Sequence, residues 1–447
     1  MGTFNCSKLI MKSTQFWLLF SFFIIAPTCC GVTLNVADLE KWLEDYASAP
    51  IDGLAQSDYG KGDLGVLNRY IPPGFQQQFD FSKLKIKVSP TKSYARHDLY
   101  MKATEKYKST TKIAENGSLE NYVAGQPFSN LQILDATPRI AGLMIAWNNV
   151  YRWQNFGYKA DLGLSYIERG GQGNNRLLDG MKGGGNVVRD VVAFYQRVYL
   201  SGLATEYDND YRLQVSGSDT LLYKEYMEMF SPYDLAGLKF IIERPLNQEL
   251  GDQVNSYLPS ERRVRRLSAK ERADSFIGTH WTLDDLEGWS GMVLDNEWRY
   301  LGNKVVLSIP NSEHEAPQFY GPLSTTPDDT WELRECYVVE AVPKWSGHPY
   351  GRRIIFIDKE TFTIPYTLVF NQKGELWKIL QIVYQDSKKP ASRLPADSPL
   401  RWRASVVIDI TDSTANIAVS LGETEFPTVS PSKVRRLFSV SNLSEGR

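Results

Sequence analysis

The chain has 447 residues, which is enough for one large or two ordinary domains. Its hydrophobic content of 42% and charged content of 23% are typical of a soluble globular protein. The formal net charge of -2 provides no overall positive field, which argues against nucleic acid as a partner. The 11 Trp, 24 Tyr and 20 Phe suit an all-β protein with large cavities or interfaces, although β propensity alone explains most of them.

Residues 1–31 are predicted to be a cleaved signal peptide. Lys8 and Lys12 precede the apolar run 16–26, which is too short to act as a stop-transfer helix, and small residues follow it. Met11 is as good a start as Met1. No later segment is long and apolar enough to cross a membrane, so we expect a periplasmic protein.

Three of the four cysteines, Cys6, Cys29 and Cys30, lie in or beside this leader. Cleavage is expected near Cys30 or Gly31, and a lipoprotein acylated at Cys29 or Cys30 is the alternative. The mature chain then retains Cys336 without a partner for a disulfide. Cys336 lies in a strand-like run, so a buried small hydrophobic residue is expected there rather than a nucleophile.

The first half of the mature chain mixes helix and turn signals. The spacing of Val36, Leu39, Leu43 and Tyr46 predicts a helix. Asn116-Gly117 predicts a hairpin turn between two short strands.

Two glycine runs, 169–173 and 183–185, lack the Lys-Ser/Thr of a phosphate loop and the full dinucleotide fingerprint, so we interpret both as flexible connectors. Asn186 is predicted to cap a helix. The apolar face of that helix would comprise Val188, Val191, Val192, Tyr195, Val198 and Tyr199.

From about Tyr207 onward the pattern becomes β, with short strands separated by turn signals at close spacing. This spacing favours one long antiparallel meander over βαβ units. Gly302-Asn303 is predicted to be a two-residue hairpin turn. Other strands are expected at 353–358, 361–370, 376–380 and 404–410, and the last residues, with Arg435 and Arg436, are expected to form a surface tail.

The usual chemical motifs are not found. The four histidines show no metal-binding spacing; they are His97, His280, His314 and His348. His314 lies between Glu313 and Glu315, but adjacent loop residues are expected to be solvated rather than to bind a metal. No nucleophile elbow is present. Carboxylate pairs such as Asp284-Asp285 and Asp328-Asp329 occur, but a position in the sequence gives no separation in space, so they do not support a glycosidase. We therefore expect no catalytic residue, no metal and no cofactor.

An ordered series of motifs between Asp219 and Gln385 resembles the LolA/LolB-like lipoprotein-carrier superfamily of bacterial envelope proteins. Ala124–Phe128 and Gly142–Asn148 are similar to a long periplasmic branch of that superfamily, whose members are mostly of unknown function. The series comprises Tyr257-Leu-Pro with four following arginines, Phe276–Thr279, Leu283–Leu286, Tyr337–Lys344, Ile357–Phe362 and Gly374–Lys378.

The resemblance implies a mainly β (α+β) fold, in which an antiparallel sheet curls into an open half-barrel and helices cover its concave side. An N-terminal α+β region, 32–205, would pack on a half-barrel formed by 206–447, which ends in a hairpin and the tail. In that superfamily the cleft between sheet and helices holds acyl chains. An incomplete barrel leaves inward side chains that a helix or an apolar ligand must cover.

Seven residues are candidates for ligand binding. The apolar ones would line the cleft, where each buried ligand methylene contributes about 0.8 kcal/mol, and methionine adapts to varied shapes. Plain core packing is the alternative for each of them. Arg263 and Arg265 could hold a lipid phosphate or carboxylate, but pairing with Glu261, Glu271, Asp284 and Asp285 is favoured. The apolar candidates are Met227, Met229, Leu238, Phe240 and Ile242.

The leading hypothesis is a non-enzymatic periplasmic carrier or binding protein for a lipid or other hydrophobic molecule. The resemblance implies, as partners, an inner-membrane exporter of the resistance-nodulation-division (RND) type and an outer-membrane protein. A ligand-free interaction module of the envelope is the alternative. The carrier hypothesis requires a hollow beside the sheet that the protein's own side chains do not fill.

Overall fold

The computed structural model describes residues 33–94, 96–170, 181–386, 399–422 and 430–444. The predicted signal peptide, with Cys6, Cys29 and Cys30, lies outside the described residues, and so does most of the glycine run 169–173. Residues Leu34–Arg447 form one structural unit.

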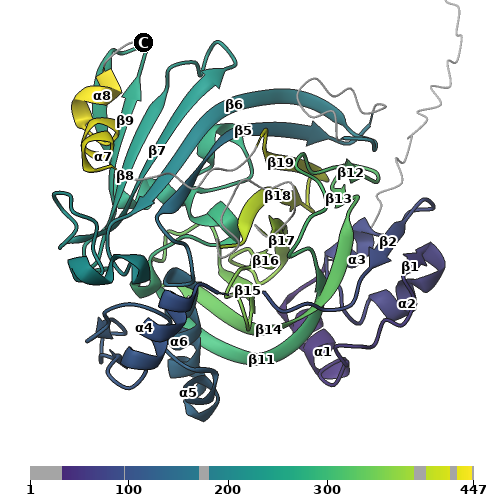
Figure 1. The fold of residues 1–447 in the computed structure, drawn as a ribbon. Coiled ribbons are helices and arrows are strands. Elements are labelled where there is room, and N and C mark those ends of the chain that lie inside the picture. The colour runs from purple at the N-terminus through teal and green to yellow at the C-terminus, as the bar shows by residue number, and fades with distance from the viewer. Residues whose placement is uncertain (1–32, 95, 171–180, 387–398, 423–429, 445–447) are drawn as a thin grey trace, which may run out of the picture. The chain divides into compact units, whose positions relative to one another are not determined.

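Among the described residues, fifteen strands form one open mixed sheet (Figure 1). All neighbouring strands pair antiparallel except β2 and β14, which are parallel. A fifteenth strand, β11 (Asn296–Ser308), pairs with β14 off the main path. The order along the main path is β1 (Asp58–Gly60), β2 (Lys85–Val88), β14 (Thr330–Pro343), β15 (Arg352–Asp358), β16 (Tyr366–Phe370), β17 (Leu376–Gln385), β18 (Arg401–Asp409), β19 (Thr414–Ser420), β5 (Gly157–Glu168), β6 (Asn186–Tyr199), β7 (Leu221–Ser231), β8 (Lys239–Pro245), β9 (Gln253–Leu258) and β10 (Arg263–Leu267).

The remaining elements are short helices, 3-10 turns and two small ladders. The ladders pair β3 (Lys112–Ile113) with β4 (Leu119–Glu120), and β12 (Phe319–Tyr320) with β13 (Thr326–Pro327). The α-helices are α1 (Val36–Asp45), α2 (Leu64–Leu67), α3 (Phe75–Gln78), α4 (Asp98–Tyr107), α5 (Asn130–Asp135), α6 (Pro138–Val150), α7 (Pro431–Leu437) and α8 (Val440–Ser444). The 3-10 turns are η1 (Lys61–Asp63), η2 (Ala204–Asn209), η3 (Ala269–Ala273), η4 (Phe276–Gly278), η5 (Leu283–Gly288) and η6 (Val293–Asp295).

Both faces of the sheet are covered because side chains alternate across each strand. In β15, Ile354 and Phe356 join the apolar cluster that contains α1, α2 and α3, whereas Ile355 and Ile357 pack with α6. In β8, at the other end of the sheet, Ile241 packs in the cluster formed with α7 and α8. Figure 1 shows these two helices beside β8 and β9.

Several local predictions are confirmed. The structure is mainly β with an open sheet. The predicted N-terminal helix is α1, which Asn35 caps through its side chain, and Asn116-Gly117 turns β3 into β4. Cys336 is fully buried in β14.

The helix predicted from Asn186 to Tyr199 is wrong, because this segment is strand β6. Its valines fit either a helical stripe or the alternation of a strand, and they are β-branched residues that favour strands. Pairing with β5 on one side and β7 on the other decides for the strand. The predicted stripe is therefore split between the two faces of the sheet.

The hairpin predicted at Gly302-Asn303 is also wrong. Strand β11 continues through these residues, and the register against β14 shifts between Tyr300 and Gly302. The glycine therefore marks a β-bulge, which inserts one extra residue and bends the strand without reversing it.

The second glycine run is a packed contact rather than a flexible connector. The backbone N–H of Gly183 donates to Ser324 Oγ at 3.1 Å, and that of Gly184 donates to the carbonyl oxygen of Gly321 at 2.8 Å. A Cβ at Gly183 would come within 2.3 Å of that carbonyl oxygen, so a larger residue would separate the two backbones.

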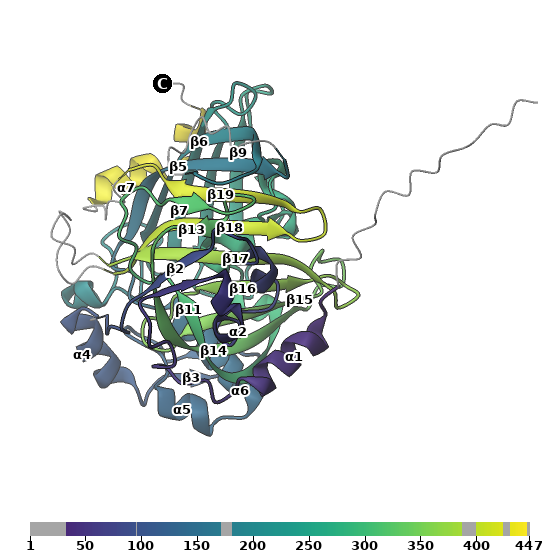
Figure 2. The same cartoon turned by 90° about the vertical axis from the view of Figure 1, so that its right-hand side faces the viewer.

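The boundary expected at residue 205 falls between two neighbouring strands of one sheet. Strands β5 and β6 of the N-terminal region lie between β19 and β7 of the C-terminal region. Figure 2 shows β17, β18, β19, β5 and β6 in succession. The expected C-terminal tail instead forms α7 and α8, because Val434, Phe438 and Leu443 are buried against the sheet.

Candidate functional site

An apolar cavity of about 70 Å³ lies between the sheet and the segment 276–288, which we name the covering segment. The covering segment consists of η4, η5 and the residues between them. Its contribution to the cavity wall is Phe276, Trp281, Thr282, Leu283, Asp285 and Leu286. The sheet contributes Leu162 and Leu164 of β5, Ala193 of β6, Met227 and Met229 of β7, Trp402 and Ser405 of β18, and Ala418 of β19.

The strand residues reach the cavity because they occupy alternate positions on one face of neighbouring strands. Leu164 of β5 is paired with Val191 of β6 and with Ala418 of β19, and Ala193 of β6 is paired with Met229 of β7. Alanines at two of these positions leave room that leucine or valine would occupy. The cavity is thus produced by small residues within a row of large apolar ones.

The covering segment follows an irregular path over these strands. Ile277 and Glu287 have φ of 47° and 54°, a conformation that non-glycine residues adopt only at a cost in energy. Gly288 has φ of 91°, and a Cβ there would lie 2.6 Å from Ile364. The segment therefore passes close to the sheet immediately after it has covered the cavity.

The Asp285 carboxylate fastens the covering segment to the sheet. It accepts hydrogen bonds from the backbone N–H and hydroxyl of Thr282, both at 2.9 Å, and from the Tyr350 hydroxyl at 2.8 Å. Arg353 of β15 donates to it at 3.1 Å, and both charged side chains are fully buried. Burial and the neighbouring carboxylate raise the pKa of Tyr350, so this hydroxyl stays protonated as a donor.

A second buried network holds the other end of the covering segment. Arg197 of β6 pairs with Glu225 of β7 at 2.7 Å and lies 3.4 Å from Glu287, which also pairs with Arg152. The Tyr158 hydroxyl donates to Glu287 at 2.7 Å, and burial raises the pKa of this tyrosine. The network contains two arginines and two glutamates, so its charges are neutralised by ion pairs within the network.

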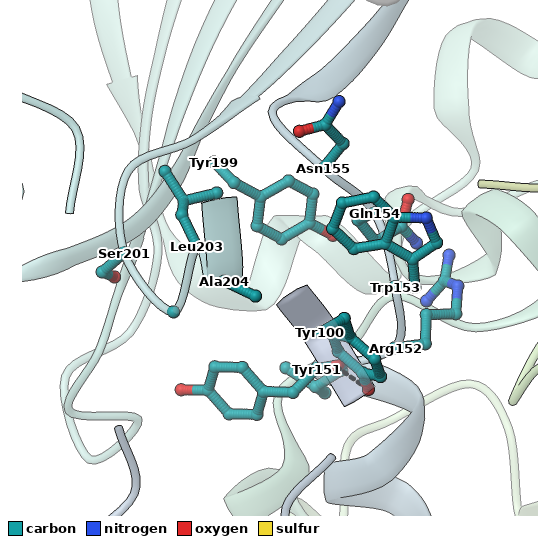
Figure 3. Close-up of a pocket in the computed structure, with 12 residues that line it drawn as sticks. Tyr100, Tyr151, Arg152, Trp153, Gln154, Asn155, Tyr199, Ser201, Leu203 and Ala204 are labelled. Atoms are coloured by element: carbon teal, nitrogen blue, oxygen red, sulfur yellow. Dashed lines mark hydrogen bonds between the residues drawn. The ribbon is translucent and has the colours of Figure 1, made fainter. Parts of the chain in front are cut away.

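A smaller, more polar cavity of about 20 Å³ borders this network (Figure 3). It lies where α4, the end of α6 and the end of β6 meet, and the Tyr100 hydroxyl donates to the Tyr151 carbonyl oxygen across it at 2.8 Å. A volume of this size holds about one water molecule. This smaller cavity has no room for an organic ligand, so we take the apolar cavity as the candidate binding site.

The predicted ligand-binding residues fall into three groups. Met227 and Met229 line the apolar cavity. Phe240 and Ile242 belong to the same apolar cluster and Leu238 packs against it, but none of these three lines the cavity. Arg263 and Arg265 are exposed on β10, the last strand in the sheet order.

Among the residues that the structure describes, an expected partner of the arginine run is found for one arginine. Arg265 pairs with Glu261 at 2.5 Å on the surface. The prediction that Asp284 and Asp285 pair with this run is wrong. Asp284 pairs with Arg272 at 2.8 Å, and Asp285 pairs with Arg353, which is much further along the chain.

Sequence reasoning missed most of the cavity wall. Leu162 and Leu164 show the alternation of a strand, but they lie outside the segments in which strands are expected from the sequence. Ala193 lies in the segment predicted to be a helix, and a helix prediction gives no neighbours on adjacent strands; the segment is strand β6. The aromatic residues of the covering segment lie within or beside the family motifs, but their sequence pattern does not indicate which face of the sheet they cover.

Asp409, His280 and Thr414 form a series that resembles an acid, a base and a nucleophile. His280 Nε2 lies 2.7 Å from the Thr414 hydroxyl, but its Nδ1 is 3.8 Å from Asp409. The Asp409 carboxylate accepts hydrogen bonds from Trp377 and from Thr411, so it is already used by the turn after β18. None of the three catalytic-type residues lines the apolar cavity, and this geometry is that of a structural contact.

Within the described residues, no group of three or more His, Cys, Asp or Glu side chains is arranged to hold a metal ion. In the same part of the chain, no helix has the length and apolar character needed to cross a membrane.

The fold and the cavity define a mainly β protein in which a buried apolar hollow lies beside an open sheet. Residues 61–443 match the family described as "Protein of unknown function (DUF1329)", so the chain belongs to that family. This confirms, at the level of the family, that the motifs mark a branch whose members are of unknown function.

The chain is 23% identical over 304 residues to an uncharacterized protein of Pseudomonas aeruginosa, covering 64% of this chain and 60% of that relative. The solved structures similar to this chain include the following two. A DUF1329 family protein from Desulfovibrio piger has a TM-score of 0.45 and 16% identity, covering 69% of this chain and 100% of the other. A LolA superfamily protein from Nitrosomonas europaea has a TM-score of 0.37 and 11% identity, with 67% and 97% covered.

Proposed function

We propose that this protein is a non-enzymatic periplasmic carrier or binding protein for a lipid or another hydrophobic molecule, and that it assists an envelope transport system. The observation that carries the proposal is the apolar cavity under the covering segment. Its wall contains two methionines, two leucines of β5 and two tryptophans, a lining suited to hydrocarbon. An exporter in the inner membrane and an outer-membrane protein are the proposed partners.

The cavity is too small for a whole acyl chain with the covering segment in its present position. Its volume is about 70 Å³, whereas an engineered apolar cavity that binds benzene measures about 150 Å³. A ligand larger than a few carbon atoms therefore has to displace Phe276, Trp281 or Leu286. Each methylene that takes their place removes apolar surface from water and contributes about 0.8 kcal/mol.

The proposal is tested with protein purified from periplasm. Native mass spectrometry is expected to show bound lipid, and an apolar fluorescent dye is expected to bind and to be displaced by a fatty acid. Ala418→Phe fills the cavity from a half-buried position and is expected to weaken dye binding by at least about tenfold, since a tenfold change corresponds to 1.4 kcal/mol.

Ala136→Phe is the matched control, because Ala136 is also half-buried but packs in the separate cluster around α6. It is expected to leave dye binding unchanged. A ligand-free protein that binds no dye, or equal dye binding in both variants, would overturn the carrier proposal and favour an interaction module.

A further inference from the structure

Seven basic side chains gather where the sheet order ends, and we name this surface the basic corner. It is formed by the turn before β10, by β10 itself and by α7. All of these side chains are exposed. They are Arg262, Arg263, Arg265, Arg266, Lys433, Arg435 and Arg436.

The basic residues of β10 and of α7 lie on neighbouring elements, because α8 packs on β10 and α7 directly precedes α8. Within this edge strand Arg266 shares the face of Val264, whereas Arg263 and Arg265 point to the other face. Val264 of β10 belongs to the same apolar cluster as Val434 of α7 and Leu443 of α8. Lys239 of β8 donates to the carbonyl oxygen of Asn442, which ties α8 to the adjacent strands. Figure 1 shows α7 and α8 beside β8 and β9.

The charge of the basic corner is largely uncompensated. Among the described residues its one ion pair is between Arg265 and Glu261, and both side chains are substantially exposed. An exposed pair of this kind contributes little to stability. The concentration of charge stands out because the whole chain has a net charge of -2.

A fully exposed aromatic side chain belongs to a neighbouring turn. Tyr233, in the turn between β7 and β8, is 98% exposed. This turn lies alongside the turn before β10, since a Cβ at Gly237 would come within 3.1 Å of Pro259. Tyrosine combines an apolar ring with a polar hydroxyl, which suits the boundary between lipid headgroups and hydrocarbon.

We propose that the basic corner docks this protein on an anionic phospholipid surface. Guanidinium groups bind phosphate oxygens in a bidentate manner, and clusters of four to eight basic residues are typical of sites for anionic lipid. Charges on an edge strand also prevent edge-to-edge aggregation. That role does not account for the three basic residues of α7, which is not part of the sheet, or for the exposed tyrosine.

The test is co-sedimentation of the full chain with vesicles. Binding is expected to phosphatidylglycerol mixed with phosphatidylcholine, not to phosphatidylcholine alone, and to disappear at about 1 M salt, where the Debye length is about 3 Å. Replacing all four arginines by glutamine is expected to weaken binding by at least about tenfold. The triple variant K433Q, R435Q, R436Q is expected to weaken it as well.

The control variant replaces four exposed lysines elsewhere by glutamine, with the same loss of charge; they are Lys83, Lys102, Lys112 and Lys373. It is expected to bind nearly as wild type does. Equal weakening in the control, equal binding to neutral vesicles, or no binding at low salt would overturn the proposal; in the last case an acidic protein surface becomes the partner to test. Docking does not rest on the proposed function, because the arginine variant is expected to keep dye binding in the cavity.

Discussion

At the scale of a single residue, the imidazole of His348 couples stability to pH. Its Nδ1 accepts a hydrogen bond from the backbone N–H of Tyr350 at 2.9 Å, which requires an unprotonated nitrogen. Burial and the nearby Arg353 charge lower the pKa of His348 to about 4. An unfolded histidine binds a proton below about pH 6.5. Between these values the unfolded state holds more protons, so the folded state loses stability as the pH falls.

We expect the free energy of unfolding to decrease by about 3 kcal/mol between pH 6.5 and 4 because of this one group. His348→Gln keeps an acceptor but cannot titrate, so its stability should depend less steeply on pH. Urea denaturation of both proteins at intervals of pH measures the difference. Parallel curves for the two proteins would contradict the assignment.

At the scale of the element, the covering segment depends on one buried ion pair. Asp285→Ala leaves Arg353 buried without its partner and removes the acceptor for Thr282 and Tyr350. Removing one member of a buried pair typically costs about 3–5 kcal/mol. Denaturant unfolding is expected to show a loss of this size, and the apolar dye is expected to gain access to the cavity.

Asp274→Ala is the control for this prediction, since Asp274 is exposed just before the same segment, and it should change stability by less than about 0.5 kcal/mol. The double variant D285A, R353M removes both charges and should recover part of the lost stability. Equal stability of D285A and wild type would show that the pair does not hold the segment.

At the scale of the whole molecule, β5 and β6 join the two halves of the sheet. They lie between β19 and β7, so a chain that starts at residue 206 would lack both intervening strands. It would also lose the inward Leu162, Leu164 and Ala193 from the cluster around the cavity. The remaining strands would expose unpaired backbone groups and apolar faces.

We therefore expect residues 206–447 alone to lack a cooperative unfolding transition, whereas residues 34–447 should unfold cooperatively. Calorimetry and near-ultraviolet circular dichroism distinguish the two outcomes. A sharp transition in the shorter chain would show that the predicted boundary separates independent folding units.

The extent of sequence-based prediction differs between fold and site. The mainly β architecture, α1 and the turn at Asn116-Gly117 were predictable because each depends on neighbouring residues. Met227 and Met229 were predicted as lining residues, and the structure places both at the cavity. Ala193 was not predicted as a lining residue. A small residue borders a cavity only if its neighbours on other strands leave the space open, and the sequence does not show which residues those neighbours are.

The sequence by itself determined the local features: the N-terminal helix α1, the burial of Cys336 and membership of a family through ordered motifs. Only the tertiary structure decided that 186–199 is a strand, that Asp285 pairs with Arg353 and that α8 lies against β10. The physical reason is that these outcomes depend on contacts between residues far apart in the chain. Periodicity and local propensity describe one segment and do not specify which other segment it meets.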